Sequence, residues 1–540
     1  MCLAELDTPY NLDTPYEPND TMADAPNDER GMPHSAPCPL LPASVRWGVY
    51  LVLIAVAVGN MTGRLVAVNS VDKALLETTR VRERLEQERA RLAEAGLSET
   101  EIEAQLPAVE ARLRNQLKLQ RPFLSANDRS RWMTVRSLVE HGTYEIDSIV
   151  GQPTWDTIDM VQHRGRDGEL HLYSSKPPLL ATLVAGLYWI IHWFSGATLG
   201  DHPYEIGRVI LFFVNILPLV LMYVVIGRLV ERFGTTDWGR IFVMAAATLG
   251  TFLSTFAIVL NNHIPAAVSA AVAVYALARI AYDGERRLRY FALAGFAAAF
   301  AAANELPAVA LMGAIGLLLL WRAPWQTIVA GVPAVVIVAA AFFGTNYIAH
   351  DSLRPPYMHR SATDPEDDWY SYTYTVNGRE RESYWLDRQG IDRGEESVGL
   401  YTLHSLVGHH GVFSLTPIWL LSLWGMLLWL ARGDWPRREL ALLVGALTIV
   451  CLVFYIGLRP QEDRNYGGMT SGFRWMFWFT PLWLLTMLPA ADRLARRTVG
   501  MAFAAVLLTV SVLSASYPTW NPWIHPWLYN WLEWTGWKGF

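Results

Sequence analysis

Ten apolar runs follow one another between residues 206 and 516, and they constrain the fold of this chain more than any other feature. An eleventh run, 45–66, precedes them. Apolar segments of about 17–25 residues are long enough to cross the hydrocarbon core of a bilayer as helices. The sequence therefore predicts an all-α polytopic membrane protein with about eleven transmembrane helices. The ten later runs are 206–229, 239–260, 264–282, 288–303, 306–321, 326–348, 412–432, 439–458, 472–491 and 498–516.

Composition supports this class and argues against others. Of the 540 residues 52% are hydrophobic and 17% are charged, and the mean hydropathy is +0.19, above that of an average soluble protein. A net charge of −6 gives no electrostatic support for a nucleic-acid partner. The three cysteines, Cys2, Cys38 and Cys451, lie outside the large polar loops, so no disulfide framework is indicated there.

The segments between the apolar runs divide the chain further. Residues 1–43 are acidic and proline-rich, which is typical of a disordered cytoplasmic tail. In the charged segment 71–120 leucines recur at helical spacing, and Ser98 followed by Glu101 resembles a capping box, so we expect a helical hairpin outside the bilayer with a spacer or docking role. The expected order is 1–43 tail, 45–66 first span, 67–205 outer loop containing 71–120 and the surface helices, 206–348 bundle, 349–411 outer loop, 412–516 bundle, and 517–540 outer aromatic tail.

The sidedness of the chain follows from its arginines, which cluster in every second connection between the later runs. The positive-inside rule assigns those connections to the cytoplasm. The apolar segment 179–194 cannot then cross the membrane, because a crossing would reverse the side of everything after it. We expect it to lie along the outer interface and to present Lys176 to the lipid headgroups. The polar turns 261–263 and 304–305 and the loops 349–411 and 459–471 then share the outer face with Asp128.

Asp128 is the first candidate for chemistry. The segment from Asn127 to His141 carries apolar residues on one helical face, so we expect it to lie on the bilayer surface with Asp128 near its N-terminus. Asp128 has no obvious neutralising partner other than Arg129 and Arg131. Its carboxylate could accept a proton from an acceptor hydroxyl. The alternative is a helix-terminal charge that interacts with the helix dipole.

Two cations are candidates for holding a phosphate. Lys176 precedes two prolines that suit a helix start, and it could bind a phosphate or extend toward lipid headgroups. Arg474 follows the glycine-rich segment 465–472 at the edge of an apolar run, where an unpaired arginine is costly. A bound phosphate is one partner for Arg474, and the carboxylate of Glu305 is the other.

Further polar residues fall on the same face and are possible substrate-binding residues: Tyr173, Asn262, His263, Glu305, His409 and His410. Their spacing matches no strong metal signature, so hydrogen bonding to sugar or phosphate is favoured over a divalent metal, and no cofactor is expected. The aromatic residues of 349–411, among them Trp369 and Tyr370, could cover such a site.

In the order and placement of these features the sequence resembles the membrane glycosyltransferases of the GT-C superfamily, specifically the family 39 group of protein O-mannosyltransferases and bacterial aminoarabinose transferases. The resemblance rests on Asp128 in the first outer loop, on Tyr173 to Pro178 before a second surface helix, and on the glycine-rich loop ending in Arg474. Arg129 stands where the family has glutamate, and 71–120 looks like an insertion.

The resemblance implies a GT-C-like fold and a polyprenyl-phosphate-linked sugar as donor. It implies inverting transfer to a hydroxyl of a protein, lipid or glycan. The transfer would take place on the exoplasmic face of the membrane, which in bacteria would be the inner membrane. Asp128 would be the base, and Lys176, Arg474 and Arg131 would bind the donor phosphate. The alternative is a polytopic transporter or lipid flippase, which would also need many spans. Transporters commonly show internal repeats and polar residues near the bilayer midplane, and neither is evident here.

Overall fold

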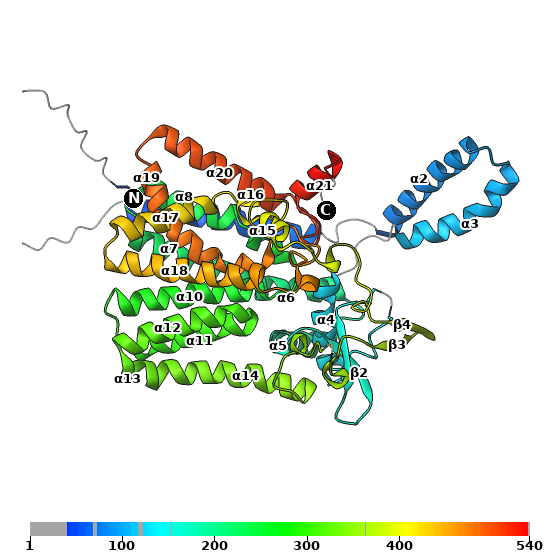
Figure 1. Ribbon diagram of the computed structural model, residues 1–540, viewed down its shortest axis with the longest axis horizontal. Coiled ribbons are helices and arrows are strands. Elements are labelled where there is room, and N and C mark those ends of the chain that lie inside the picture. The colour runs from blue at the N-terminus through cyan, green and yellow to red at the C-terminus, as the bar shows by residue number, and fades with distance from the viewer. Residues whose placement is uncertain (1–39, 68–72, 117–122, 153, 362, 538–540) are drawn as a thin grey trace, which may run out of the picture. The chain divides into compact units, whose positions relative to one another are not determined.

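The computed structural model describes residues 40–67, 73–116, 123–152, 154–361 and 363–537, and its ordered elements are mostly helices (Figure 1). Within these ranges eight helical segments are long and apolar enough to cross a membrane, so the chain is an integral membrane protein, as predicted. They are α1 (Ala43–Ala67), α5 (Pro178–Ser195), α6 to α7 (Pro203–Phe233), α8 to η2 (Asp237–Ile258), α10 (His263–Ala281), α13 to α14 (Pro324–His350), α18 to η8 (Trp435–Gly457) and α20 (Thr498–Ser516).

Seven of these eight segments match predicted spans, and α5 is the exception. The other four predicted spans correspond to shorter helices: α11 (Leu288–Asn304), α12 (Val309–Arg322), α17 (Trp419–Arg432) and α19 (Thr480–Leu494). The total of about eleven spans therefore stays a prediction. Three of the long segments contain π-helical turns: η1 (Phe212–Ile216) in Pro203–Phe233, η4 (Thr327–Gly331) in Pro324–His350 and η8 (Val453–Gly457) at the end of Trp435–Gly457.

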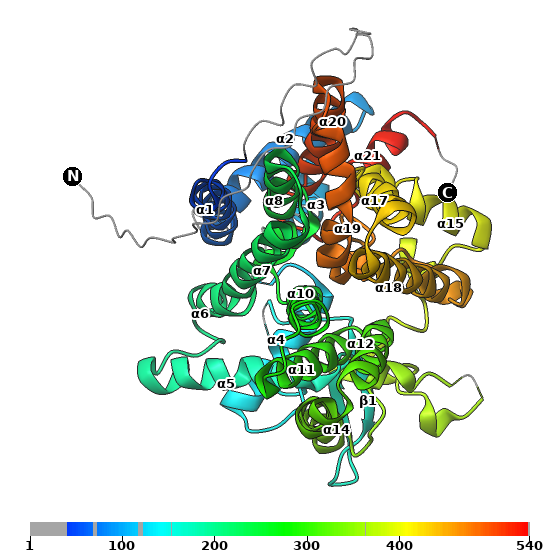
Figure 2. The same ribbon diagram turned by 90° about the vertical axis from the view of Figure 1, so that its left-hand side faces the viewer.

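The orientation of α5 supports its assignment to the membrane surface. In Figure 2 this helix lies lengthwise in the view, whereas α1, α10 and α14 are seen close to end-on. It packs against α4 (Ala126–Glu140) and the end of α14. Trp189, Trp193 and Phe194 remain exposed on its outer side. An exposed aromatic face on a helix that crosses the bundle direction is typical of an interfacial helix.

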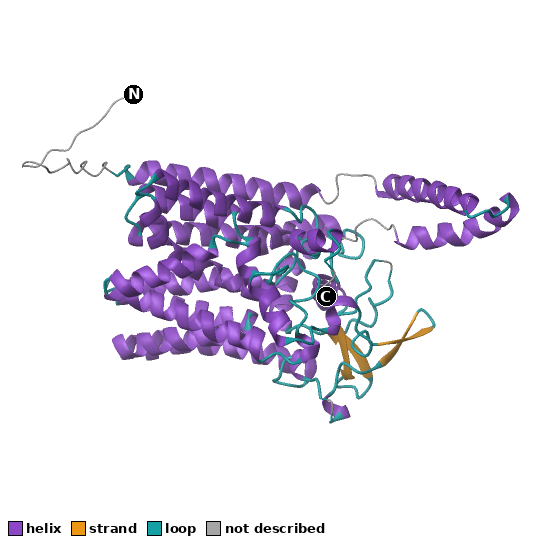
Figure 3. Ribbon diagram, turned by 45° about the horizontal axis from the view of Figure 1, so that its top comes forward, coloured by secondary structure: helices purple, strands orange, loops and turns teal. Residues whose placement is uncertain are grey.

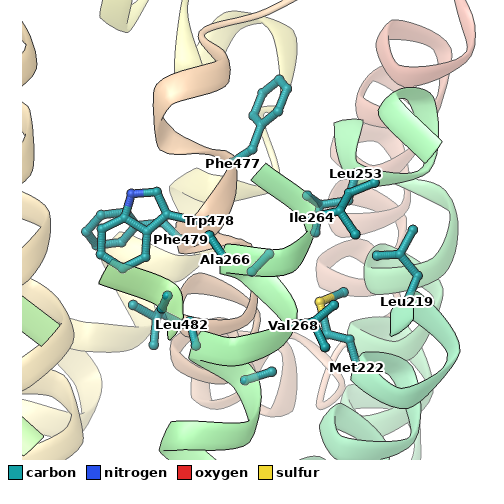
Figure 4. Packing of buried hydrophobic residues seen from close by; sticks show 14 of the residues in the cluster. Leu219, Met222, Leu253, Ile264, Ala266, Val268, Phe477, Trp478, Phe479 and Leu482 are labelled. Carbon is teal, nitrogen blue, oxygen red and sulfur yellow. The ribbon is translucent and has the colours of Figure 1, made fainter. Parts of the chain in front are cut away.

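The bundle is packed around α10, which contacts α7 (Leu217–Phe233), α11 and η10 (Arg474–Phe479). Alanines occupy much of α10 and allow neighbouring backbones to approach closely. Figure 4 shows Ile264, Ala266 and Val268 at the start of α10 between side chains of α7 and η10. The side chains drawn there that lie in this buried core include Leu219, Met222, Leu253, Phe477, Trp478, Phe479 and Leu482. This apolar layer surrounds the first turns of α10.

The interpretation of α4 as a helix on the bilayer surface is wrong. Every residue from Asp128 to Ser137 is buried, including three arginines. Their polar atoms are satisfied inside the protein: Arg129 donates to the carbonyls of Phe123 and Asp156, and Arg136 pairs with Glu140 at 2.8 Å. The sequence pattern showed an apolar face, but the opposite polar face is covered by protein as well. Helix α4 is therefore enclosed, and Asp128 lies inside the protein.

Two small antiparallel hairpins lie at one end of the bundle (Figure 3). The predicted hairpin around Asp167-Gly168 is confirmed: β1 (Met160–Arg164) pairs with β2 (Leu170–Ser174), and Met160 lies opposite Ser174. Gly168 has a φ of +86°, the left-handed conformation that such a turn favours. The second hairpin, β3 (Thr373–Val376) and β4 (Arg379–Glu382), belongs to the loop 349–411.

The charged segment forms the predicted helical hairpin. Helix α2 (Lys73–Glu94) packs against α3 (Glu99–Gln116), and the Glu101 carboxylate accepts hydrogen bonds from the backbone and side chain of Ser98. The predicted tail 1–43 lies outside the described residues apart from its last four. The remaining short elements are α9 (Phe252–Thr255), η3 (Leu306–Ala308), η5 (Pro356–Met358), η6 (Pro365–Asp367), η7 (Gly390–Arg393), α15 (Val398–Leu406), α16 (Val412–Leu415), η9 (Gln461–Asp463) and α21 (Trp527–Trp534).

Candidate functional site

A continuous chain of polar contacts joins Lys176 to Arg474 across six separate elements of the structure. It begins with the ion pair between Lys176 Nζ and Asp159 Oδ2, which are 2.6 Å apart. Asn127 Nδ2 donates to the same Asp159 oxygen over 3.1 Å. The Asn127 side-chain oxygen in turn accepts a hydrogen bond from Arg131. These four residues link the start of α4 to the segment just before β1 and to the segment just after β2.

The second half of this polar chain runs from α4 into the membrane bundle. Arg131 Nη2 donates to Asn262 Oδ1 over 2.7 Å, and Asn262 Nδ2 donates to Glu305 Oε1 over 2.8 Å. His263 Nδ1 contacts the same Glu305 oxygen, so this nitrogen carries the proton and Nε2 is the acceptor. That Nε2 lies 3.5 Å from Arg474 Nη1. The polar chain therefore ends at the first residue of η10.

Local structure explains why residues so distant in sequence meet. Met160 pairs with Ser174, so Asp159 stands opposite Ser175, whose hydroxyl donates to the Asp159 carboxylate. Lys176 follows directly, and Pro177 and Pro178 fix the backbone where α5 begins. The β1–β2 hairpin thus delivers a carboxylate and an ammonium to the same point.

Arg474 is held by two outer segments. Its Nε donates to the carbonyl of Gly467 over 2.7 Å, and its guanidinium lies 5.0 Å from the centre of the Trp523 ring. Gly467 has a φ of +93°, and a Cβ there would stand 3.1 Å from Arg474 Cγ, so the close approach requires glycine. The glycines of this loop therefore position the arginine, and the C-terminal segment covers it with an aromatic ring.

The electrostatics of the polar chain leave one positive charge in excess. Lys176, Arg131 and Arg474 are cations, and Asp159 and Glu305 are carboxylates, which gives three positive charges against two negative. Burial is the main cause that lowers the pKa of Lys176 to about 8 and that of Arg131 to about 10. The neighbouring cations act in the same direction, and Asp159 opposes them. Burial alone would raise the pKa of Asp159, but Lys176 and Ser175 outweigh it and hold that pKa below its usual value. An anion would relieve the crowding of cations.

Asp128 adjoins this polar chain without being part of it. The two carboxylate oxygens accept hydrogen bonds from the backbone N–H groups of Leu260, over 2.9 Å, and Leu124, over 3.2 Å. The side chain is therefore held by main-chain donors as well as lying near Arg129 and Arg131, and the residue is 1% exposed. Burial raises the pKa of Asp128 to about 7. A cleft of about 20 Å³ beside Leu124 has room for no more than a water molecule.

Three other predicted residues lie in different clusters. Tyr173 is buried and stacks on His163, with ring centres 4.1 Å apart, so its ring is committed to packing. His409 and His410 are buried against Tyr466 and His404. Burial lowers the pKa of His409 to about 3, so it is neutral at physiological pH. The structure therefore separates these three residues from the polar chain, which contains six of the predicted residues: Lys176, Arg131, Asn262, His263, Glu305 and Arg474.

The aromatic residues of the loop 349–411 also differ from the expectation that they could cover the site. Trp369, Tyr370 and Tyr372 are buried. The Trp369 ring lies against His163 of β1, with centres 4.1 Å apart, and the Tyr372 hydroxyl donates to the carbonyl of Met160. These rings attach the loop to the β1–β2 hairpin, and the three of them are not available for a ligand.

The sequence reading missed three members of the site: Asn127, Asp159 and Trp523. Asp159 could have been found from the predicted hairpin, because pairing of the two strands places it opposite the residues before Lys176. Asn127 precedes Asp128 in the sequence and reaches the site because it lies in the first turn of α4. No sequence signal points to Trp523. Among the described residues no three histidine, cysteine or carboxylate side chains gather so as to hold a metal ion.

Comparisons with known proteins give a distant structural likeness. No family model matches the chain, and no curated protein matches its sequence. Two solved structures resemble it at a TM-score of 0.34. One is the crystal structure of the Archaeoglobus fulgidus oligosaccharyltransferase in complex with Zn and sulfate, with 13% identity over 77% of this chain and 55% of that one. The other is the oligosaccharyltransferase AglB of the same organism with an inhibitory peptide and a dolichol-phosphate, with 14% identity over 76% of this chain and 54% of that one. The chain spans about half the length of these proteins, and a similarity at this level does not determine its function.

Proposed function

We propose that this protein is an integral membrane glycosyltransferase that moves a sugar from a polyprenyl-phosphate donor to a hydroxyl acceptor. The observation that carries the proposal is the polar chain from Lys176 to Arg474. It gathers three cations and two carboxylates at one end of a membrane bundle, with one positive charge in excess. A lipid-linked phosphate could enter such a site from the bilayer, with its lipid tail among the helices and its charge at the cations.

The cations would act on the leaving group. As the bond between the anomeric carbon and the phosphate oxygen breaks, negative charge builds up on the phosphate. Lys176, Arg131 and Arg474 would stabilise that charge, and their own charges are already crowded in a site with little water. A phosphate that leaves as an anion needs no proton from the protein, so one base is enough for the reaction. The acceptor oxygen would bond to the anomeric carbon from the opposite face, which inverts its configuration.

Asp128 is the proposed base, which would take the proton from the acceptor hydroxyl. Its pKa of about 7 suits a general base at neutral pH. Asp159 is a poorer candidate, because Lys176 and Ser175 hold its pKa low and occupy its oxygens. Asp128 is enclosed in the present conformation, so this role requires the Leu124 or Leu260 contact to open when substrates bind. Asp159 would instead position Lys176.

The position of the polar residues favours a transferase over the transporter alternative. His263 is the first residue of α10, Arg474 is the first of η10, and Glu305 follows the last residue of α11. The polar chain therefore lies at the ends of helices, whereas transporters commonly bind substrate near the bilayer midplane.

Binding of decaprenyl phosphate to the full chain, purified in a neutral detergent, tests the donor site directly. We expect Lys176→Met and Arg474→Gln each to weaken binding by about tenfold or more, since each removes a charge-assisted contact worth about 1.5–3 kcal/mol. Arg164→Gln is the matched control, because Arg164 is an exposed arginine of the neighbouring hairpin. Equal binding by the wild type and both site variants would refute the proposed donor site.

A further inference from the structure

Two open cavities adjoin at the end of the bundle opposite the polar chain. One has a volume of about 310 Å³ and lies between the end of α17, the start of α18 (Trp435–Leu452) and the end of α19. The other, of about 360 Å³, lies between the end of α19 and the start of α20. Arg493 and Arg496 line both. Because Arg474 precedes α19 and Arg493 lies in its last turn, the cavities and the polar chain are at opposite ends of this helix.

The charges that line these cavities are unbalanced. Arg432, Arg493, Arg496 and Arg497 form no ion pair with a carboxylate within the described ranges. Of the two aspartates in the lining, Asp434 is paired with Arg437 at 2.6 Å. The other, Asp492, accepts three hydrogen bonds from the backbone and side chain of Thr236 and the backbone of Thr235. Both carboxylates are therefore committed to local structure.

Three other arginines at the same end of the bundle form ion pairs with carboxylates. Arg46 pairs with Glu231 at 2.6 Å, Arg232 with Asp283 at 2.6 Å, and Arg322 with Glu439 at 2.5 Å. The four arginines of the cavities are exposed, and two of them, Arg493 and Arg496, line both cavities. An anion between them would be attracted by several positive charges at once.

We propose that these cavities bind a phosphate group, in a site separate from the proposed donor site and independent of the proposed transferase reaction. Guanidinium groups match phosphate oxygens with two parallel hydrogen bonds, and several converging arginines favour a group with more than one acceptor oxygen. Trp424 and Trp429 supply an apolar wall beside the arginines. The volumes fall in the range of small-ligand pockets. The phosphate could belong to the headgroup of an acidic lipid in the leaflet next to these cavities, or to a soluble phosphate compound.

Binding by delipidated full-length protein in a neutral detergent distinguishes the two sources. The lipid probe is phosphatidylglycerol, with phosphatidylcholine for comparison, measured by native mass spectrometry. The soluble probe is inorganic pyrophosphate, measured by the rise in melting temperature. The site variant is Arg493→Gln combined with Arg496→Gln. The control variant is Arg438→Gln, because Arg438 is exposed at the same end of the bundle and lines neither cavity.

The expected result is a loss of phosphatidylglycerol binding of about tenfold or more in the double variant, since two guanidinium groups that would contact the anionic headgroup are removed. Arg438→Gln should bind as the wild type does, and Arg496→Lys, which keeps the charge but loses the bidentate contact, should bind more weakly than the wild type but better than the double variant. A pyrophosphate response in the wild type that the double variant loses supports the site with a soluble ligand instead. Wild-type protein that binds neither probe, or a double variant that binds both equally well, would overturn the proposal.

Discussion

Lys176 and Asp159 form an ion pair with a distance of 2.6 Å between Nζ and Oδ2, and this pair anchors the polar chain to the β1–β2 hairpin. Asp159 is buried, and the Lys176 side chain is 21% exposed. The pair explains how a lysine beside a membrane helix can stay charged in a site with little water. Without the carboxylate, burial and the neighbouring arginines would act on Lys176 unopposed.

We therefore expect Asp159→Asn to lower the pKa of Lys176 from about 8 toward neutrality. A lysine whose folded-state pKa is lowered loses its proton as pH rises through that value. Binding of decaprenyl phosphate to the variant should then weaken between pH 6 and pH 8, while the wild type changes less over that range. Titration of binding against pH checks this.

The same substitution should also destabilise the fold by about 2 kcal/mol. This cost in stability is smaller than the cost of breaking a fully buried ion pair, because the Lys176 side chain keeps some contact with solvent. Thermal unfolding of the purified variant measures the cost. A variant with unchanged stability and an unchanged pH profile of binding would show that Asp159 does not hold Lys176 in its charged form.

Asp128→Asn should abolish sugar transfer. The amide cannot take a proton from the acceptor, and its NH₂ group would face a backbone N–H, of either Leu124 or Leu260. In the wild type the base must be ionised, and its pKa is about 7. Activity should therefore rise as pH increases through about 7 and level off above it. The pH profile of the transfer rate tests the assignment, and a profile that is flat from pH 6 to pH 8 would contradict it.

Much of the fold could be predicted because the bilayer imposes long apolar segments whatever surrounds them. The hairpin at Asp167-Gly168 and the cap at Ser98 were also predictable, because each depends on residues close together in sequence. Helix α4 shows the limit of such patterns. An apolar face at helical spacing identifies a buried side, but it does not reveal that Arg129 and Arg136 find partners on the other side.

The candidate site was predicted in part for a similar reason. Sidedness placed Lys176, Asn262, Glu305 and Arg474 on one face, and the structure brings all four into one polar chain. The contact that links them from α4, Arg131 to Asn262, spans 131 residues of sequence and depends on how α4 packs against the bundle. His409 and His410 share the same face, but local packing against Tyr466 directs them elsewhere.

Labelling of single cysteines should decide the sidedness. In a background without Cys2 and Cys38, we expect a membrane-impermeant maleimide to label Asp201→Cys in intact cells, because 201 follows α5, which is predicted to lie along the outer interface. Arg286→Cys lies in an arginine-rich connection and should react only after lysis. Both positions are exposed, so burial cannot explain a difference. Cytoplasmic reactivity at 201 would mean that α5 crosses the membrane.

Acid should loosen the contact between the two outer loops, because it depends on neutral histidines. His163 lies between the rings of Tyr173 and Trp369, with centres 4.1 Å from each. Its Nδ1–H donates to the carbonyl of Arg164, so its Nε2 accepts a hydrogen bond from His350 Nδ1–H, 3.0 Å away. Protonation of Nε2 would place two donors face to face.

Burial lowers the pKa of His163 to about 4, below its usual 6.5. The packing of His163 between Tyr173 and Trp369 is then fully stable above about pH 6.5. It loses up to about 3 kcal/mol of stability as pH falls toward 4. Hydrogen exchange of 160–174 and 363–372, corrected for intrinsic rates, should therefore be faster at pH 5 than at pH 7.5. His163→Phe keeps an aromatic ring in the stack but cannot titrate, so it should reduce this dependence. His359 and His350 also belong to this cluster, and Asp367 and Arg354 face His359. An unchanged pH dependence in His163→Phe would show that His163 does not cause the effect and would assign it to another histidine of the cluster.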